Sequence, residues 1–175
     1  MGYWPYKELF ANFKKPSHRI FFETGTHKGD SVQDAIDLGF ETIISVEIEP
    51  HFFDESYKRF MPLDIWGPRP TETPELYLYK GDSSFMMPEL LQKVNRPALF
   101  WLDAHRNGYE SPIKHEIKHI LNHEIDDHTI IIDDLEFVKI VYDLTSLETD
   151  FLNKNPNYKF HEAKASDATQ LIITT

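Results

Sequence analysis

The sequence contains no cysteine, and this absence excludes disulfide bonds, thiolate metal sites and a cysteine nucleophile. It also lacks any run of about 18 apolar residues, the length at which a segment becomes a candidate membrane-spanning helix. Residues 1–15 contain no long apolar core of the kind found in signal peptides. We therefore expect a soluble, cytoplasmic protein with no membrane partner.

Positive charge is scarce, because 18 Lys and Arg residues stand against 29 Asp and Glu residues, for a formal net charge of -11. Nonspecific affinity for nucleic acid depends on basic surface, so this balance argues against a nucleic-acid partner and favours a small-molecule or sugar ligand. Hydrophobic residues make up 41% of the chain and aromatic residues 14%, which is enough for a sizeable core. At 175 residues, the chain is expected to form a single domain over residues 1–175.

The stretch RIFFETGTHKGD, residues 19–30, is the strongest local pattern in the chain. Its apolar start predicts a strand, its two glycines a turn, and the apolar residues that follow at helical spacing predict a helix. Gly25 and Gly29 would let the backbone approach a ligand closely, and Asp30 or Ser31 is expected to cap the helix. The stretch is read either as a nucleotide-type binding turn or as an ordinary strand-to-helix turn.

Apolar runs and helical patterns alternate along the rest of the chain. We expect strands after the first at 42–48, 76–80, 98–102, 129–132, 158–164 and 169–174, and helices at 50–61, 88–94, 112–124 and about 136–153. A proline-rich loop is expected at 62–74. This order predicts an α/β, doubly wound, mostly parallel seven-stranded sheet with helices on both faces and a C-terminal antiparallel hairpin. Trp101 is expected to lie in the core.

Almost every predicted parallel strand ends in a carboxylate. The residues are Glu23, Glu47, Glu49, Asp82, Asp103, Asp133 and Asp134. A single acid after a strand is often a helix cap or a solvated loop residue. Ligands of open α/β sheets bind outside the carboxyl ends of the strands, so a row of acids at that edge indicates a binding site.

These motifs resemble the class I S-adenosylmethionine-dependent methyltransferases, a Rossmann-like family, over nearly the whole chain. Glu23, Gly25 and Gly29 match the family's acid and spaced glycines, while His27 stands where a central glycine is common. The resemblance implies that the cofactor is S-adenosyl-L-methionine, with Glu47 on the ribose hydroxyls and Asp82 on the adenine amine. The full set of cofactor-binding residues implied is Glu23, Thr24, Gly25, Thr26, Gly29, Glu47, Asp82, Ser83 and Asp103.

Two further motifs resemble the metal-dependent O-methyltransferases of the catechol and macrocin types. They are FWLDAH at 100–105 and IIIDD at 130–134. The resemblance implies a divalent cation, Mg²⁺ or similar, held by Asp103, Asp133 and Asp134. It also implies methyl transfer to a hydroxyl of a small molecule or sugar. His105 is the first choice for the base that removes the hydroxyl proton, and Asp103 is the second.

A competing motif is the H-E-x-x-H of His115, Glu116 and His119, which on a helix is typical of a zinc hydrolase, with Glu136 as a convenient third ligand. The apolar stripe at 113, 117, 120 and 121 predicts instead that the histidines, including His123, face solvent. Two other classes stay open. One is a nicotinamide-binding domain, although G-x-G-x-x-G is absent, and the other is a methyltransferase-like protein that binds without catalysis.

Overall fold

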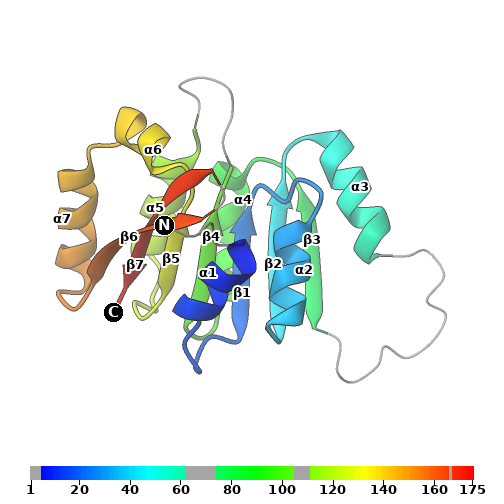
Figure 1. Cartoon of the computed structure of the whole chain (residues 1–175), viewed down its shortest axis with the longest axis horizontal. Helices are drawn as coiled ribbons and strands as arrows, with labels where there is room; N and C mark the ends of the chain where they lie inside the picture. The colour runs from blue at the N-terminus through cyan, green and yellow to red at the C-terminus, as the bar shows by residue number, and fades with distance from the viewer. Residues whose placement is uncertain (1–4, 62–73, 105–110, 166) are drawn as a thin grey trace.

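The computed structural model describes residues 5–61, 74–104, 111–165 and 167–175, and its strands form one seven-stranded sheet (Figure 1). The strands are β1 (Ile20–Thr24), β2 (Thr42–Glu47), β3 (Glu75–Lys80), β4 (Ala98–Leu102), β5 (Thr129–Ile132), β6 (Lys159–Ala165) and β7 (Ala168–Thr174). The proline-rich loop expected at 62–74 lies outside the described residues, except for its last residue. In the described part of the chain, no helix is long and apolar enough to cross a membrane.

The strand order is β3-β2-β1-β4-β5-β7-β6. The first five strands pair in parallel, while β7 runs antiparallel to both β5 and β6. The order along the chain reverses between β1 and β4, which makes the carboxyl ends of these two strands the expected place for a ligand. The predicted doubly wound sheet with its closing antiparallel hairpin is confirmed.

Helices cover both faces of the sheet (Figure 1). They are α1 (Tyr6–Phe13), α2 (Asp30–Asp37), α3 (Pro50–Phe60), α4 (Ser83–Leu90), the 3-10 turn η1 (Leu91–Lys93), α5 (Ile113–Leu121), α6 (Leu135–Val141) and α7 (Leu144–Lys154). One core cluster packs α1 and α2 against the sheet, and the other packs α4, α5, α6 and α7 against the opposite face. Side chains alternate across a strand, so in β4 Trp101 joins the first cluster and Phe100 the second. Trp101 is 1% exposed, as expected for a core residue.

Two of the expected helices differ in the structure, and α1 was not expected. The helix expected at 88–94 begins earlier, at Ser83, because the Asp82 side chain caps it by accepting a hydrogen bond from the Ser84 N–H at 2.9 Å. The helix expected at 136–153 is two helices, because the chain turns at Tyr142 and the Asp143 side chain caps a new helix through the Ser146 N–H at 2.8 Å.

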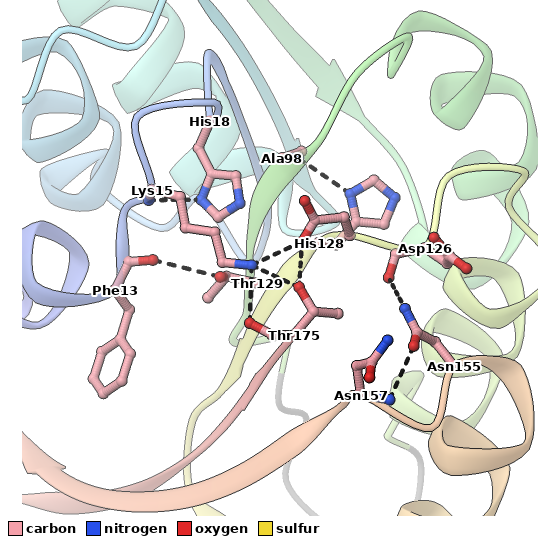
Figure 2. Close-up of polar contacts among 11 residues, drawn as sticks. Phe13, Lys15, His18, Ala98, Asp126, His128, Thr129, Asn155, Asn157 and Thr175 are labelled. Carbon is pink, nitrogen blue, oxygen red and sulfur yellow. Dashed lines mark hydrogen bonds and ion pairs between the residues drawn. The ribbon is translucent and has the colours of Figure 1, made fainter.

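The amino ends of the strands are joined by a polar network (Figure 2). The Lys15 ammonium donates to Asp127 Oδ1 at 2.7 Å and to Thr175 Oγ1 at 2.6 Å, and these bonds tie the segment before β1 to the start of β5 and the end of β7. His18 and His128 are fully buried beside this network. Each accepts a backbone N–H through Nδ1, from Lys15 and from Ala98 respectively, both at 3.1 Å. This network is structural, and the expected place for a ligand is the opposite, carboxyl edge.

Candidate functional site

A cavity of about 820 Å³ lies at the carboxyl ends of the parallel strands. That volume is in the range of small-molecule sites. Its walls come from the turn after β1, the end of β2 and start of α3, the turn after β3, the end of β4 and the start of α5. The lining residues are Gly25, His27, Val46, Glu47, Ile48, Glu49, Phe52, Gly81, Asp82, Ser83, Ser84, Asp103, Ala104, Ser111, Pro112, His115 and Asp134.

Gly25 brings the turn after β1 against the end of β4. Its φ of +86° lies in the left-handed region, and a Cβ placed there would stand 2.5 Å from the Asp103 carbonyl oxygen. The Gly25 N–H donates to the Val46 carbonyl at 2.9 Å, which fixes the turn to β2 as well. Only glycine combines this backbone conformation with so close an approach.

Gly29 has a structural role at the start of α2. It is buried with a φ of +80°, and a Cβ there would overlap the Phe60 ring of α3. Gly29 itself occupies the N-cap position, and no side chain caps the helix. The expected cap from Asp30 or Ser31 is therefore wrong, because the Ser31 hydroxyl donates to the Glu23 carboxylate instead.

His27 takes the left-handed conformation that glycine usually occupies, with a φ of +48°. Such a conformation costs a non-glycine residue about 1–2 kcal/mol. The imidazole packs against the Phe52 ring with centroids 4.0 Å apart, and the backbone N–H donates to Glu47 Oε2 at 2.7 Å. These two contacts hold the turn in place although the sequence lacks a glycine there.

Glu47 is the best-defined carboxylate of the cavity wall. It ends β2, is 5% exposed, and accepts backbone N–H bonds on both oxygens, from His27 at 2.7 Å and from Glu49 at 2.8 Å. Two lone-pair positions on the carboxylate are left over, and they suit a ligand with neighbouring hydroxyl groups.

Three carboxyl groups at or near the cavity have raised pKa values; Glu23 and Glu116 are buried, and Asp103 is half-buried in the cavity lining. Burial raises the pKa of Glu23 to about 8 and that of Glu116 to about 7. Burial, together with the neighbouring Asp133 carboxylate, raises the pKa of Asp103 to about 9. Glu23 and Asp103 are therefore mainly protonated at neutral pH and can donate a hydrogen bond, whereas Glu116 becomes an ionised acceptor as the pH rises above about 7. Such perturbed groups gather at functional sites.

The residues predicted to bind the cofactor divide into two sets. Those that line the cavity are Gly25, Glu47, Asp82, Ser83 and Asp103. Those buried beneath it, outside its lining, are Glu23, Thr24, Thr26 and Gly29. The second set supports the turn from below, with Thr26 and Ser45 sharing a hydrogen bond across β1 and β2. His105, the predicted base, lies outside the described residues.

The three predicted metal ligands do not converge. Asp103 and Asp134 both line the cavity. Asp133 is buried, and its two oxygens accept bonds from Gln170 Nε2 at 2.7 Å and from the Tyr6 hydroxyl at 3.1 Å. Among the residues that the structure describes, no three His, Asp or Glu side chains form a group that could hold a metal ion.

The H-E-x-x-H residues face three directions. His115 lines the first cavity, whereas His119 lines a second cavity of about 710 Å³ formed by residues from 88–95 and 119–125. Glu116, between them, is 1% exposed and accepts a bond from the Ser83 hydroxyl at 2.5 Å. The proposed third ligand, Glu136, is exposed and pairs with Lys139 at 2.7 Å. This geometry does not favour a zinc hydrolase.

The expectation that His115, His119 and His123 all face solvent is wrong for His119 and His123. His119 Nε2 lies 3.1 Å from the Ser84 carbonyl oxygen. His123 bonds to His128 at 3.1 Å and to the Leu91 carbonyl at 3.2 Å. Imidazole nitrogens at the edge of an apolar stripe can reach carbonyls on the neighbouring helix, which a pattern of exposed and buried positions does not show.

Glu116 was predicted only as part of a zinc-hydrolase motif and was not placed beside the first cavity. With Ile113, Ile117 and Ile120 it occupies positions i, i+3, i+4 and i+7 of a helix, so its carboxyl lies on the buried stripe. An acid on an apolar stripe is the signal that could have revealed it. Tyr6, which bonds to Asp133, gave no such signal, because only the packing of α1 brings it to the carboxyl edge.

No protein-family model matches the chain, and no curated protein matches it. Solved structures do resemble it. An O-methyltransferase from Streptomyces achromogenes involved in tomaymycin synthesis, solved in complex with SAM, has a TM-score of 0.59 and 14% identity over 97% of this chain and 78% of its own. A ribosomal protein L11 methylase from Lactobacillus delbrueckii subsp. bulgaricus has a TM-score of 0.58 and 16% identity over 96% of this chain and 75% of its own.

A third structure, the methyltransferase domain of bacterial CtHen1, has a TM-score of 0.62 and 12% identity, covering 96% of this chain and 95% of its own. At these identities the likeness concerns the fold. The fold is the Rossmann-like fold of class I methyltransferases, with the strand order and the antiparallel hairpin described above.

Proposed function

We propose that this chain is an S-adenosylmethionine-dependent methyltransferase that methylates a hydroxyl group of a small molecule or sugar. The observation that carries the proposal is the placement of Glu47. Its carboxylate stands in the cavity wall at the end of β2, between the glycine turn and Asp82, and two backbone N–H groups hold it there at 2.7 and 2.8 Å.

The hydrogen-bonding side chains that line the cavity fit a nucleoside cofactor. Glu47 would accept hydrogen bonds from the ribose hydroxyls, and Asp82 from the adenine amine, while Phe52 offers an apolar surface beside them. Gly25 holds the turn after β1 against the end of β4, at the cavity wall. When bound, S-adenosyl-L-methionine supplies an electrophilic methyl group. The predominance of acids also agrees with a cofactor that lacks phosphate.

The chain's own part in the reaction is to place the acceptor oxygen, exclude water and take up the hydroxyl proton. Asp103 lines the cavity, but its pKa of about 9 keeps it protonated at neutral pH, so it would act as a base only where a neighbouring charge lowers that pKa. His105 therefore stays the first proposal for the base.

A divalent cation is a separable part of the proposal. Mg²⁺ in enzymes is commonly held by one or two carboxylates together with water and substrate oxygens, so Asp103 and Asp134 would suffice without Asp133. The cation would orient the acceptor oxygen and stabilise its charge. In this arrangement Asp133 supports the site through Tyr6 and Gln170.

Titration calorimetry tests cofactor binding with S-adenosylmethionine, S-adenosylhomocysteine and NAD. We expect both sulfur nucleosides to bind and NAD not to bind. Glu47→Ala should weaken binding by about 1–3 kcal/mol, the cost of losing a charged acceptor. Asp54→Ala is the matched control, because Asp54 is exposed on α3 and does not line the cavity. Binding of NAD alone at millimolar concentration would refute the proposal.

The cation is tested by chelation. Excess EDTA should lower methyl transfer to catechol or sugar acceptors while S-adenosylmethionine binding persists. Calorimetry with Mg²⁺ alone should detect a site that Asp134→Asn weakens. Full turnover in EDTA, with no heat of Mg²⁺ binding, would remove the cation and leave the methyltransferase proposal intact.

A further inference from the structure

Ser83 and Glu116 form a buried pair at the wall of the first cavity. Ser83 is the first residue of α4 and lines the cavity beside Asp82. Its hydroxyl donates to Glu116 Oε1 at 2.5 Å, and the two residues are 5% and 1% exposed. Glu116 comes from α5, so the pair joins two helices that converge on the same corner.

A carboxyl at position 116 is costly for packing alone. Its neighbours on the stripe are Ile113, Ile117 and Ile120, all at most 2% exposed. Burial of an acid among apolar side chains opposes its ionisation and lowers the stability of the fold. The Ser83 hydroxyl would be satisfied equally well by a neutral acceptor, so the hydrogen bond alone does not explain why an acid is present.

A carboxylate differs from a neutral partner in having no donor. When Glu116 is ionised, the Ser83 hydroxyl donates its one proton to the Glu116 carboxylate. The lone pairs on the serine oxygen can then only accept a hydrogen bond from a ligand. Asp82, next to it, is also an acceptor when ionised, and its Oδ1 is already bonded to Ser84. Side-chain groups in this corner of the cavity would therefore favour a ligand that donates hydrogen bonds.

We propose that Glu116 is a positioning residue that fixes the Ser83 hydroxyl as a hydrogen-bond acceptor and so makes the cavity select an amino group over an oxo group on the nucleobase of its ligand. The proposal rests on the proposed nucleoside cofactor. It adds a residue of α5, remote in sequence from the adenine-binding motif, to the discrimination of the base.

The test compares S-adenosylhomocysteine with S-inosylhomocysteine, which carries an oxo group in place of the amine. Both are titrated at about pH 8, above the pKa of about 7 that burial gives Glu116. We expect the native protein to prefer the amine by about tenfold or more, the value of one mismatched hydrogen bond. Ser83→Ala and Glu116→Gln should each reduce this ratio several-fold, because glutamine lets the serine turn either way. The double variant should lose no more than either single one.

Glu89→Gln is the control, because Glu89 is exposed on α4 and lies outside the cavity lining. It should leave the ratio unchanged. A purely structural role for Glu116 would weaken both ligands equally, and an unchanged ratio in folded Glu116→Gln overturns the proposal. If that variant does not fold, an unchanged ratio in Ser83→Ala overturns it instead. Failure of the native protein to bind either nucleoside would be a failure of the proposed function, which is a different outcome.

Discussion

At the scale of single residues, the turn after β1 depends on two left-handed backbone positions with different side chains. Gly25 adopts a φ of +86°, and the Asp103 carbonyl oxygen occupies the space that a Cβ would need. His27 adopts a φ of +48° and offsets the strain through its contacts with Phe52 and Glu47. Conformation alone therefore does not require glycine in this turn, whereas close approach of the backbone does.

The first prediction concerns Gly25→Ala. We expect a loss of about 2–4 kcal/mol in the free energy of unfolding, because the new methyl group collides with the Asp103 carbonyl in addition to the strained φ. Gly39→Ala is the matched control. Gly39 has a similar φ of +71° but no atom within 4 Å of the added Cβ, so it should lose only about 1 kcal/mol.

Urea unfolding measures the loss of stability in both variants, and calorimetry with S-adenosylhomocysteine measures how each variant changes ligand binding in the cavity. Gly25→Ala should weaken that ligand, whereas Gly39→Ala should not. Equal stability losses in the two variants would mean that the contact with Asp103 is relaxed at no cost.

At the scale of elements, a hydrogen bond connects α5 to α4 at the point where a proline interrupts the hydrogen bonding of α4. Pro88 has no N–H, so the Ser84 carbonyl four residues earlier lacks its helical partner. His119 Nε2 lies 3.1 Å from that carbonyl oxygen and takes the place of the missing donor. The second histidine of the H-E-x-x-H sequence thus has a structural explanation.

The second prediction separates the two histidines. His119→Ala should cost about 1–3 kcal/mol of unfolding free energy, because it leaves a helical carbonyl without its partner. His115→Ala should cost less than about 0.5 kcal/mol, because His115 is exposed. Chemical denaturation measures both. Reversal of this order, or loss of a stoichiometric zinc and of peptidase activity in both variants, would restore the hydrolase reading.

Much of this architecture is predictable because it depends on local patterns. The run at 98–102 is wholly apolar and the run at 129–132 is three isoleucines after Thr129, and both form strands buried on both faces. The start of α4 was missed because the Asp82 cap was read only as a ligand-binding acid. The break before α7 was missed because the Asp143 cap was overlooked within a continuous helical pattern.

The candidate site was predictable to the extent that it follows strand ends. Glu47 and Asp103 stand where a parallel sheet places them, at one edge. The partners of Asp133 were not predictable from the sequence, because Tyr6 and Gln170 reach it from a helix and an antiparallel strand far away in the chain. Long-range polar contacts of this kind have no local signature.

At the scale of the whole molecule, the buried histidines and the buried glutamates have opposite effects on how the stability of the fold depends on pH. His18 and His128 have pKa values lowered to about 4 and about 3, mainly by burial, so acid below their ordinary 6.5 favours the unfolded chain, which binds their protons more readily. Glu23 and Glu116 have raised pKa values, so the folded chain holds protons that the unfolded chain releases above pH 4.5. Stability that depends on these acids is lost as the pH rises.

The third prediction is a stability maximum on the acid side of neutrality. Between about pH 6.5 and 8 both histidines are neutral in the folded chain and lose their remaining protons in the unfolded chain, so their effect fades. Glu23 and Glu116 therefore dominate among these four groups, and the unfolding free energy should fall as the pH rises. The net charge of -11 acts in the same direction through repulsion. Melting temperatures across this range measure the slope.

Glu23→Gln should flatten that slope, because its amide does not titrate, while the decline below about pH 5 should persist with His18 and His128 in place. Glu41→Gln serves as the control, since Glu41 is exposed at the opposite edge of the sheet. A melting temperature that rises steadily from pH 6.5 to 8 would show that the carboxyl groups are ionised in the folded chain.

The bond from the Tyr6 hydroxyl to Asp133 spans 127 positions of the chain. Around it, Leu9 and Phe10 of α1 belong to the same core cluster as Ile131 of β5 and Ile172 of β7. Helix α1 is synthesised before all seven strands, yet its docking surface is complete only when β7 has been synthesised. During translation the apolar face of α1 therefore stays uncovered until β7 has been made. Because docking closes so long a loop, we expect it to be a late step of folding.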